Sequence, residues 1–186
     1  MPTFDPASYG PVIAALLQER RLMPLGPGDP NDPARPKLKS LTIERAFAPH
    51  PIKDAEMANA CCAGLWLYHD FLDDSHKICQ AIETTTGSYW HGIMHRREPD
   101  YSNSKHWFRR VGVHPIFGSL RAAAAELAGT ATLHTSATFL TTQSDWDPFA
   151  FIDLCEAASA GRSPHEMLCR QVQQREWELL FDHCYR

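Results

Sequence analysis

The fold expected for this chain rests on residues 55–83, which read AEMANACCAGLWLYHDFLDDSHKICQAIE. Asp54 stands immediately before this stretch and can cap a helix, because its side-chain oxygens accept hydrogen bonds from the first free backbone N–H groups. At about 100° per residue, apolar side chains cover nearly the whole circumference, and only Asp70, Asp74 and Lys77 form a narrow polar stripe. A helix of this kind usually lies at the centre of a bundle, so the stretch predicts an all-α protein built around one long helix.

Capping residues, prolines and glycines mark the other expected helices. They are expected at residues 6–22, 89–97, 101–111, 115–129, 148–160 and 164–184. Residues 24–36 carry five prolines and two glycines, which predicts a surface loop, whereas residues 130–144 remain open between extended chain and helix. We therefore expect a single-domain helical bundle over residues 1–186, with about seven helices and a Pro-rich N-terminal loop.

Composition narrows the possible environments and partners. The chain has 186 residues and a net charge of −4, which makes general nucleic-acid binding unlikely. No apolar run approaches the length of a membrane span, and the N-terminus lacks the pattern of a secretory signal. None of the six cysteines forms a C-x-x-C pair, which favours buried free thiols. These features predict a cytoplasmic protein without a membrane partner.

Histidines and carboxylates are concentrated between residues 69 and 98. His69, Asp73 and His76 share one face of the expected long helix, and His91, His95 and Glu98 share one face of the next. Two facing helices with such side chains can build a metal site or an acid/base pocket. The expected ligands of a divalent metal, zinc or iron, are His69, Asp73, His91 and His95. The expected acid/base groups are His69, His76, Glu98 and the loop histidine His114.

Basic and aromatic residues near these histidines suggest a small anionic substrate. A guanidinium offers a planar fork of donors that suits carboxylate or phosphate groups. The expected substrate-binding residues are Arg96, Arg97, Lys105, Trp90, Tyr101 and Asn103. The alternative, equally consistent with the sequence, is that the arginines form ion pairs within the protein.

Several catalytic motifs are absent. The H-x-x-x-H of His91 and His95 has Gly92 where the zinc metalloprotease signature needs glutamate. There is also no G-x-S-x-G nucleophile elbow and no glycine-rich phosphate loop.

Two segments carry a resemblance. Residues 88–112, SYWHGIMHRREPDYSNSKHWFRRVG, and residues 67–76, LYHDFLDDSH, resemble segments of an uncharacterised bacterial protein family of similar length. The resemblance implies no particular activity.

Two functional hypotheses follow from the sequence. The first is a small enzyme, a metal-dependent hydrolase or oxygenase acting on a small anionic substrate. The second is a non-catalytic binding or scaffold protein, in which the polar residues form a structural buried network.

Overall fold

The computed structural model describes residues 4–186, and all the regular structure in this range is helical. The helices are α1 (Gly10–Leu17), α2 (Arg35–Lys39), α3 (Ile43–Phe47), α4 (Ala55–Tyr68), α5 (Leu72–Cys79), α6 (Thr85–Arg97), α7 (Tyr101–Val111), α8 (Phe117–Gly129), α9 (Phe139–Thr142), α10 (Pro148–Ser159) and α11 (Glu166–Tyr185). Short 3-10 turns cover Pro6–Tyr9, Asp32–Ala34 and Thr135–Ala137. The all-α prediction is confirmed. The expected count of about seven helices is wrong, because eleven lie within residues 4–186.

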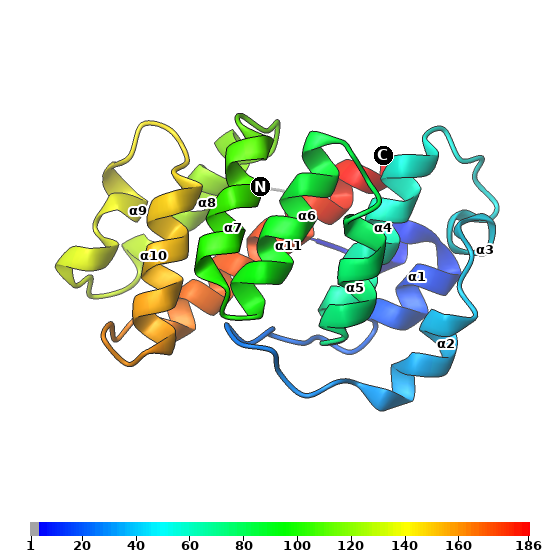
Figure 1. The fold of residues 1–186 in the computed structure, drawn as a ribbon, viewed down its shortest axis with the longest axis horizontal. Coiled ribbons are helices and arrows are strands. Elements are labelled where there is room, and N and C mark those ends of the chain that lie inside the picture. The colour runs from blue at the N-terminus through cyan, green and yellow to red at the C-terminus, as the bar shows by residue number, and fades with distance from the viewer. Residues whose placement is uncertain (1–3) are drawn as a thin grey trace.

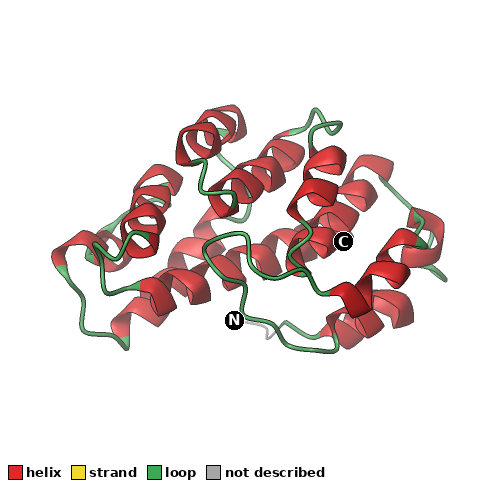
Figure 2. Cartoon of the chain, turned by 60° about the horizontal axis from the view of Figure 1, so that its bottom comes forward, coloured by secondary structure: helices red, strands yellow, loops and turns green. Residues whose placement is uncertain are grey.

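The arrangement places α6 near the middle of the molecule. Helices α5, α6, α7 and α10 lie side by side, and the long α11 crosses behind them (Figure 1). The second view shows loops joining short helices across one face of this arrangement (Figure 2). Buried apolar residues from both ends and the middle of the chain, such as Ile13, Trp90 and Phe181, belong to one continuous hydrophobic cluster. No helix among residues 4–186 is long and apolar enough to cross a membrane.

The expected helix over residues 55–83 is interrupted, which corrects the sequence prediction. Helix α4 ends at Tyr68 and α5 starts at Leu72, with Asp70 between them at a φ of 64°. This left-handed backbone is uncommon for a residue other than glycine. The Asp70 carboxylate contacts Arg97 Nη2 at 2.5 Å and Arg21 Nη2 at 2.6 Å, so distant parts of the chain hold the break in place.

Close backbone approaches set the position of α6 against its neighbours. A Cβ on Gly92 would lie 2.7 Å from Phe108 of α7, and a Cβ on Gly64 of α4 would lie 2.8 Å from Trp90 of α6. Ser104 Oγ donates to the Gly92 carbonyl at 2.8 Å. Only glycine allows α4, α6 and α7 to lie this close together.

The capping residues predict the first residue of three helices correctly and that of α6 incorrectly. Asp54, Asp100 and Asp147 each cap the helix that was expected after them. Helix α6 begins at Thr85 instead of residue 89, because Thr84 accepts from the Gly87 N–H and caps it.

The helices near the two ends of the chain begin or end at other residues than predicted. Only residues 10–17 of the expected 6–22 helix are α-helical, and α11 starts at Glu166 without a side-chain cap. The expected loop over residues 24–36 overlaps a 3-10 turn at Asp32–Ala34 and the start of α2. All six cysteines are free and buried, as expected.

Candidate metal site

Three histidines from two helices come together beside α7. His91 and His95 lie one turn apart on α6, and His76 lies on α5. One ring nitrogen from each residue lies within 4.8 Å of the other two. The centroid of the His76 ring is 4.6 Å from that of His91 and 5.0 Å from that of His95. These three imidazoles form the histidine cluster.

The break at Asp70 gives α5 its own direction, and this places His76 in the cluster. Helix α5 packs against both α4 and α6, and Ser75 Oγ donates to the Ala63 carbonyl of α4 at 2.9 Å. Ser75 is fully buried and fixes the face of α5 that turns toward α4. The next residue, His76, is half-buried and its ring contacts α6.

His91 is buried without any polar partner. Its exposed fraction is 2%, and neither ring nitrogen has a hydrogen-bond partner among residues 4–186. The Trp107 ring of α7 stacks on the imidazole with a centroid distance of 3.8 Å. Burial, and then the neighbouring His95 and His76, lower the pKa of His91 to about 3, so the ring is neutral at pH 7. A neutral imidazole is the form that binds a metal.

His95 is oriented by polar groups on both sides of its ring. Its Nδ1 lies 3.0 Å from Glu98 Oε2, and the amide nitrogen of Asn103 lies 3.1 Å from its Nε2. Because the carboxylate accepts, Nδ1 carries the proton and Nε2 carries the lone pair. Burial lowers the pKa of His95, and the Glu98 charge opposes this shift. A histidine that donates its second N–H to a carboxylate is the usual arrangement of a metal ligand.

The cluster can fit one metal ion after a modest movement of its rings. Three nitrogens bound at about 2.1 Å to one tetrahedral ion lie about 3.4 Å apart. The nitrogens of the histidine cluster lie within 4.8 Å of one another, so the rings would have to move closer together to bind one ion. The three imidazoles would leave one tetrahedral position for a further ligand.

Other residues expected at the metal site lie apart from the cluster. His69 is the C-cap residue that follows α4, where its Nε2 donates to the Leu16 carbonyl and its Nδ1 accepts from Asn31, both at 3.0 Å. With both nitrogens bonded, His69 is a structural residue that ties the N-terminal segment to α4. Asp73 is exposed in the first turn of α5 and does not belong to the cluster. The expectation that His69, Asp73 and His76 share one helical face fails because the helix is broken.

The expected acid/base residues His76, Glu98 and His114 lie in different places relative to the cluster. His76 belongs to the cluster, and Glu98 reaches it only through His95. His114 bonds to Thr86 Oγ1 at 3.2 Å and accepts from the Ile116 N–H at 3.4 Å. Burial and the nearby His183 lower the pKa of His114 to about 4.

The arginines expected to bind substrate are engaged within the protein. Arg97 bonds to Asp70 at 2.5 Å and donates to the carbonyls of Gly26, Leu67 and Pro27 at 3.0 to 3.1 Å. Arg96 is fully buried and forms an ion pair with Glu176. The alternative of internal ion pairing describes both arginines.

The remaining expected substrate-binding residues are dispersed. Trp90 is buried in the core and donates to Cys184 Sγ at 3.4 Å. Lys105 pairs with Asp153 and, with Tyr101, lines a cavity of about 570 Å³ between α7 and α10. Asn103 alone touches the histidine cluster, through His95.

Two further residues lie near the cluster and were not among the expected metal-binding, acid/base or substrate-binding residues. Trp107 covers His91, and the Arg110 guanidinium lies over the Trp107 ring at 5.0 Å. A usable signal was the spacing of Asn103, Trp107 and Arg110 at i, i+4 and i+7, which places them on one face of α7.

In comparisons with known proteins, no family model matches the chain, and no curated protein or solved structure matches it. The geometry of the histidine cluster is therefore the basis for the functional argument.

Proposed function

We propose that this protein binds a divalent transition-metal ion, zinc in the first place, through His76, His91 and His95. The observation that carries the proposal is His91, whose two ring nitrogens are buried without a partner next to two further imidazoles. Leaving a buried polar group unpaired costs about 1–3 kcal/mol, and a metal ion would remove this cost. Imidazole nitrogen is among the preferred ligands of zinc.

The ligand set favours hydrolytic chemistry over oxygen chemistry. Three histidines with one open position resemble the catalytic zinc arrangement, in which the ion lowers the pKa of a bound water to about 7. Non-haem iron oxygenases use two histidines and one carboxylate, whereas the nearest carboxylate here, Glu98, bonds to His95. We therefore propose a metal-dependent hydrolase.

Residues around the cluster support this chemistry without binding the ion themselves. Glu98 holds the His95 ring in the tautomer that presents Nε2, and Trp107 shields His91 from water. Since His76 is half-buried, one side of the cluster faces the protein surface. This side is where a water molecule and a substrate would enter.

The test is the metal content of untagged protein purified without a chelator. The native chain is expected to hold close to one equivalent of zinc after incubation with the ion and desalting, and the His91→Ala/His95→Ala variant is expected to hold none. His106→Ala is the matched control, because His106 is exposed on α7 and lies outside the cluster. Equal zinc content in all three proteins would refute the proposal.

The activity arm uses activated esters such as 4-nitrophenyl acetate and 4-nitrophenyl phosphate. Hydrolysis that appears with zinc, disappears with a chelator and is absent from the double variant supports the hydrolase. Zinc binding with no hydrolysis of any ester would leave a metal-binding protein and remove the enzymatic part of the proposal.

A non-catalytic protein is the second candidate, and the buried ion pairs of Arg96 and Arg97 favour it. These ion pairs support a structural role for the polar residues on the Arg96 and Arg97 side of α6. If the histidine cluster were also structural, alanine at His91 or His95 would lower the melting temperature of the metal-free protein by several degrees.

A further inference from the structure

Arg110 differs from the other basic residues close to the site. Arg96, Arg97 and Lys105 each pair with a carboxylate, whereas Arg110 has no ion pair or side-chain hydrogen bond within residues 4–186. Its guanidinium carbon lies 5.0 Å from the centre of the Trp107 ring. The side chain is therefore held near the site by an aromatic ring, with its hydrogen-bond donors free.

The position of Arg110 on α7 connects it to the histidine cluster. Asn103, Trp107 and Arg110 follow one another along a single helical face. The first contacts His95 at 3.1 Å and the second stacks on His91 at 3.8 Å, so this face is turned toward the cluster. Arg110 follows one turn later on the same line and is exposed, with its guanidinium over the Trp107 ring.

The charges around the cluster are unevenly distributed. The Glu98 carboxylate lies beside His95, with Oε2 at 3.0 Å from Nδ1, whereas the Arg110 guanidinium lies over the Trp107 ring that stacks on His91. The His95 end of the site is therefore negative, and the His91 end is positive. An anion bound to an ion in the cluster is electrostatically favoured on the Arg110 side.

We propose that Arg110 binds the oxyanion group of the site's ligand, which is a small molecule carrying a phosphate or carboxylate group. The inference rests on the proposed metal site, because one oxygen of the anion would occupy the open position of the ion. A second oxygen would accept hydrogen bonds from the guanidinium, whose fork of N–H donors matches both anions.

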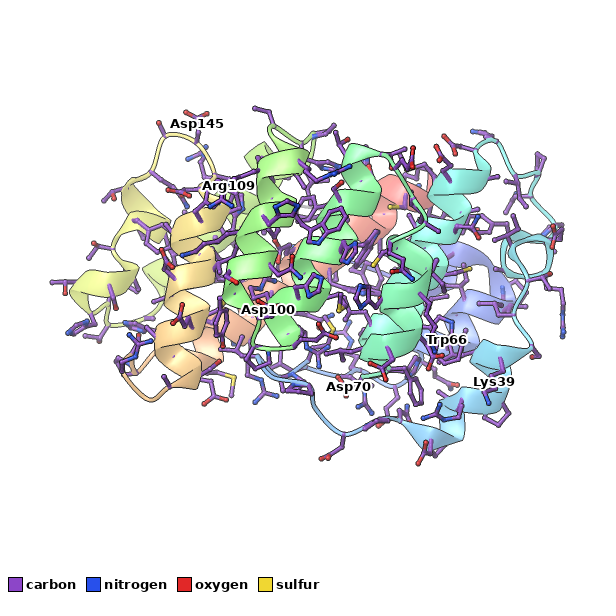
Figure 3. The ribbon with its side chains drawn as sticks, viewed as in Figure 1. Lys39, Trp66, Asp70, Asp100, Arg109 and Asp145 are labelled. Carbon is purple, nitrogen blue, oxygen red and sulfur yellow. The ribbon has the colours of Figure 1, made fainter. Side chains whose placement is uncertain are left out.

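Arg109 offers a matched control for Arg110. Both arginines are exposed in the last turn of α7. The Arg109 guanidinium lies over Phe149 of α10 at 6.0 Å, and the labelled side chain lies between α7 and α10 (Figure 3). Replacing either arginine removes one positive charge from the last turn of α7. Only Arg110 contacts Trp107, so a difference between the two variants reports on that position.

The experiment measures binding of inorganic phosphate, and separately of acetate, to the zinc-loaded protein by calorimetry at constant ionic strength. Arg110→Ala should weaken the affinity for the anion that the native protein binds by about tenfold or more, since bonds between charged groups are lost. Arg109→Ala should change the affinity less than about twofold, the level expected for an exposed charge. Arg110→Lys should recover part of the loss, because the charge remains and the fork is lost.

The outcomes separate this inference from the metal proposal. Zinc content is measured on every sample, and it should be equal in the native protein and all three arginine variants. Equal anion affinity in Arg110→Ala and Arg109→Ala, or no binding of either anion, overturns the role of Arg110 while the metal site stands. Absence of zinc from the native protein refutes the metal site itself.

Discussion

Arg97 and His91 lie six residues apart on α6, both buried and both polar, yet their surroundings are opposite. All three guanidinium nitrogens of Arg97 donate hydrogen bonds, to one carboxylate and three backbone carbonyls. His91 has no hydrogen-bond partner within residues 4–186 for either nitrogen. Buried polar groups in folded proteins are almost always paired, as Arg97 is. His91 is unpaired beside two further imidazoles, and this combination is the basis for proposing it as a metal ligand.

The same contrast applies to a second pair of residues. Arg96 forms a buried ion pair with Glu176, and Tyr89 donates to the same carboxylate at 3.1 Å. His95, by contrast, bonds to Glu98 through Nδ1 at the edge of the cluster. Its Nε2 lone pair accepts from the Asn103 side-chain amide, which a metal ion could displace. One helix thus carries a side with two buried ion pairs, where Arg96 Nη1 lacks a partner within residues 4–186, and a side with two imidazoles that could hold an ion together with His76.

The largest expected effect is on the paired side. Arg97→Met should lower the free energy of unfolding by about 3–5 kcal/mol, because Asp70 and three carbonyls lose a buried partner. Urea denaturation of the metal-free protein measures this loss. If His91→Phe destabilised the metal-free protein more than Arg97→Met, the contrast between the two sides would be wrong.

Zinc should raise the free energy of unfolding only through the histidine cluster. At a free zinc concentration 100-fold above the dissociation constant, the native protein should gain about 2.7 kcal/mol of stability. His91→Phe keeps a ring stacked on Trp107 but removes both nitrogens, so the gain should disappear while the metal-free stability stays the same or rises. Thermal unfolding with and without zinc is the measurement, and an undiminished gain in the variant would contradict the assignment of His91 as a ligand.

His114 provides a pH test at a paired histidine outside the cluster. Its pKa is about 4 in the folded protein and about 6.5 in the unfolded chain, so the unfolded chain binds more protons between these values. Stability is therefore complete above pH 6.5 and falls as the pH drops toward 4. The full shift corresponds to about 3 kcal/mol, and relaxation of the protein around the protonated ring would reduce the measured effect to roughly 2 kcal/mol.

The measurement is the unfolding free energy of metal-free protein across this range, in the native chain and in His114→Gln. The variant should have a shallower slope, because a neutral amide replaces the titrating ring. Identical slopes in the two proteins would show that His114 does not have a lowered pKa.

Glu98→Gln should produce the smallest of these effects. The amide is a weaker acceptor for the His95 Nδ1 proton, and changes to such a partner lower metal affinity by about tenfold. Competition with a chromogenic chelator measures the zinc affinity. Since Glu98 is partly exposed, the metal-free stability should change by less than about 1 kcal/mol. An unchanged zinc affinity would mean that Glu98 has no part in orienting the ligand.

Local signals were sufficient for much of the fold. The caps at Asp54, Asp100 and Asp147 depend on hydrogen bonds to the next few residues, so the sequence alone locates them. The break at Asp70 could not be predicted in this way. Its left-handed backbone is held by Arg21 and Arg97, which lie 49 and 27 residues away in the sequence.

That one break also explains the errors at the site. The i, i+4 spacing of His91 and His95 survives because both lie on α6, whereas the face shared by His69 and His76 exists only in an uninterrupted helix. The arginine pair Arg96 and Arg97 is typical of an anion-binding site. Only the tertiary structure shows that both form internal ion pairs, with Glu176 and Asp70. The spacing of Trp107 and Arg110 places them on one face of α7, but only the packing of α7 against α6 shows that Trp107 covers His91.

The most direct test of the metal site is a crystal of untagged protein soaked in zinc, with diffraction data collected on both sides of the zinc absorption edge. We predict one strong anomalous peak between His76, His91 and His95, with zinc–nitrogen distances of about 2.0–2.1 Å. No peak at the cluster, with all three rings keeping the positions described for the metal-free protein, would contradict the proposed function.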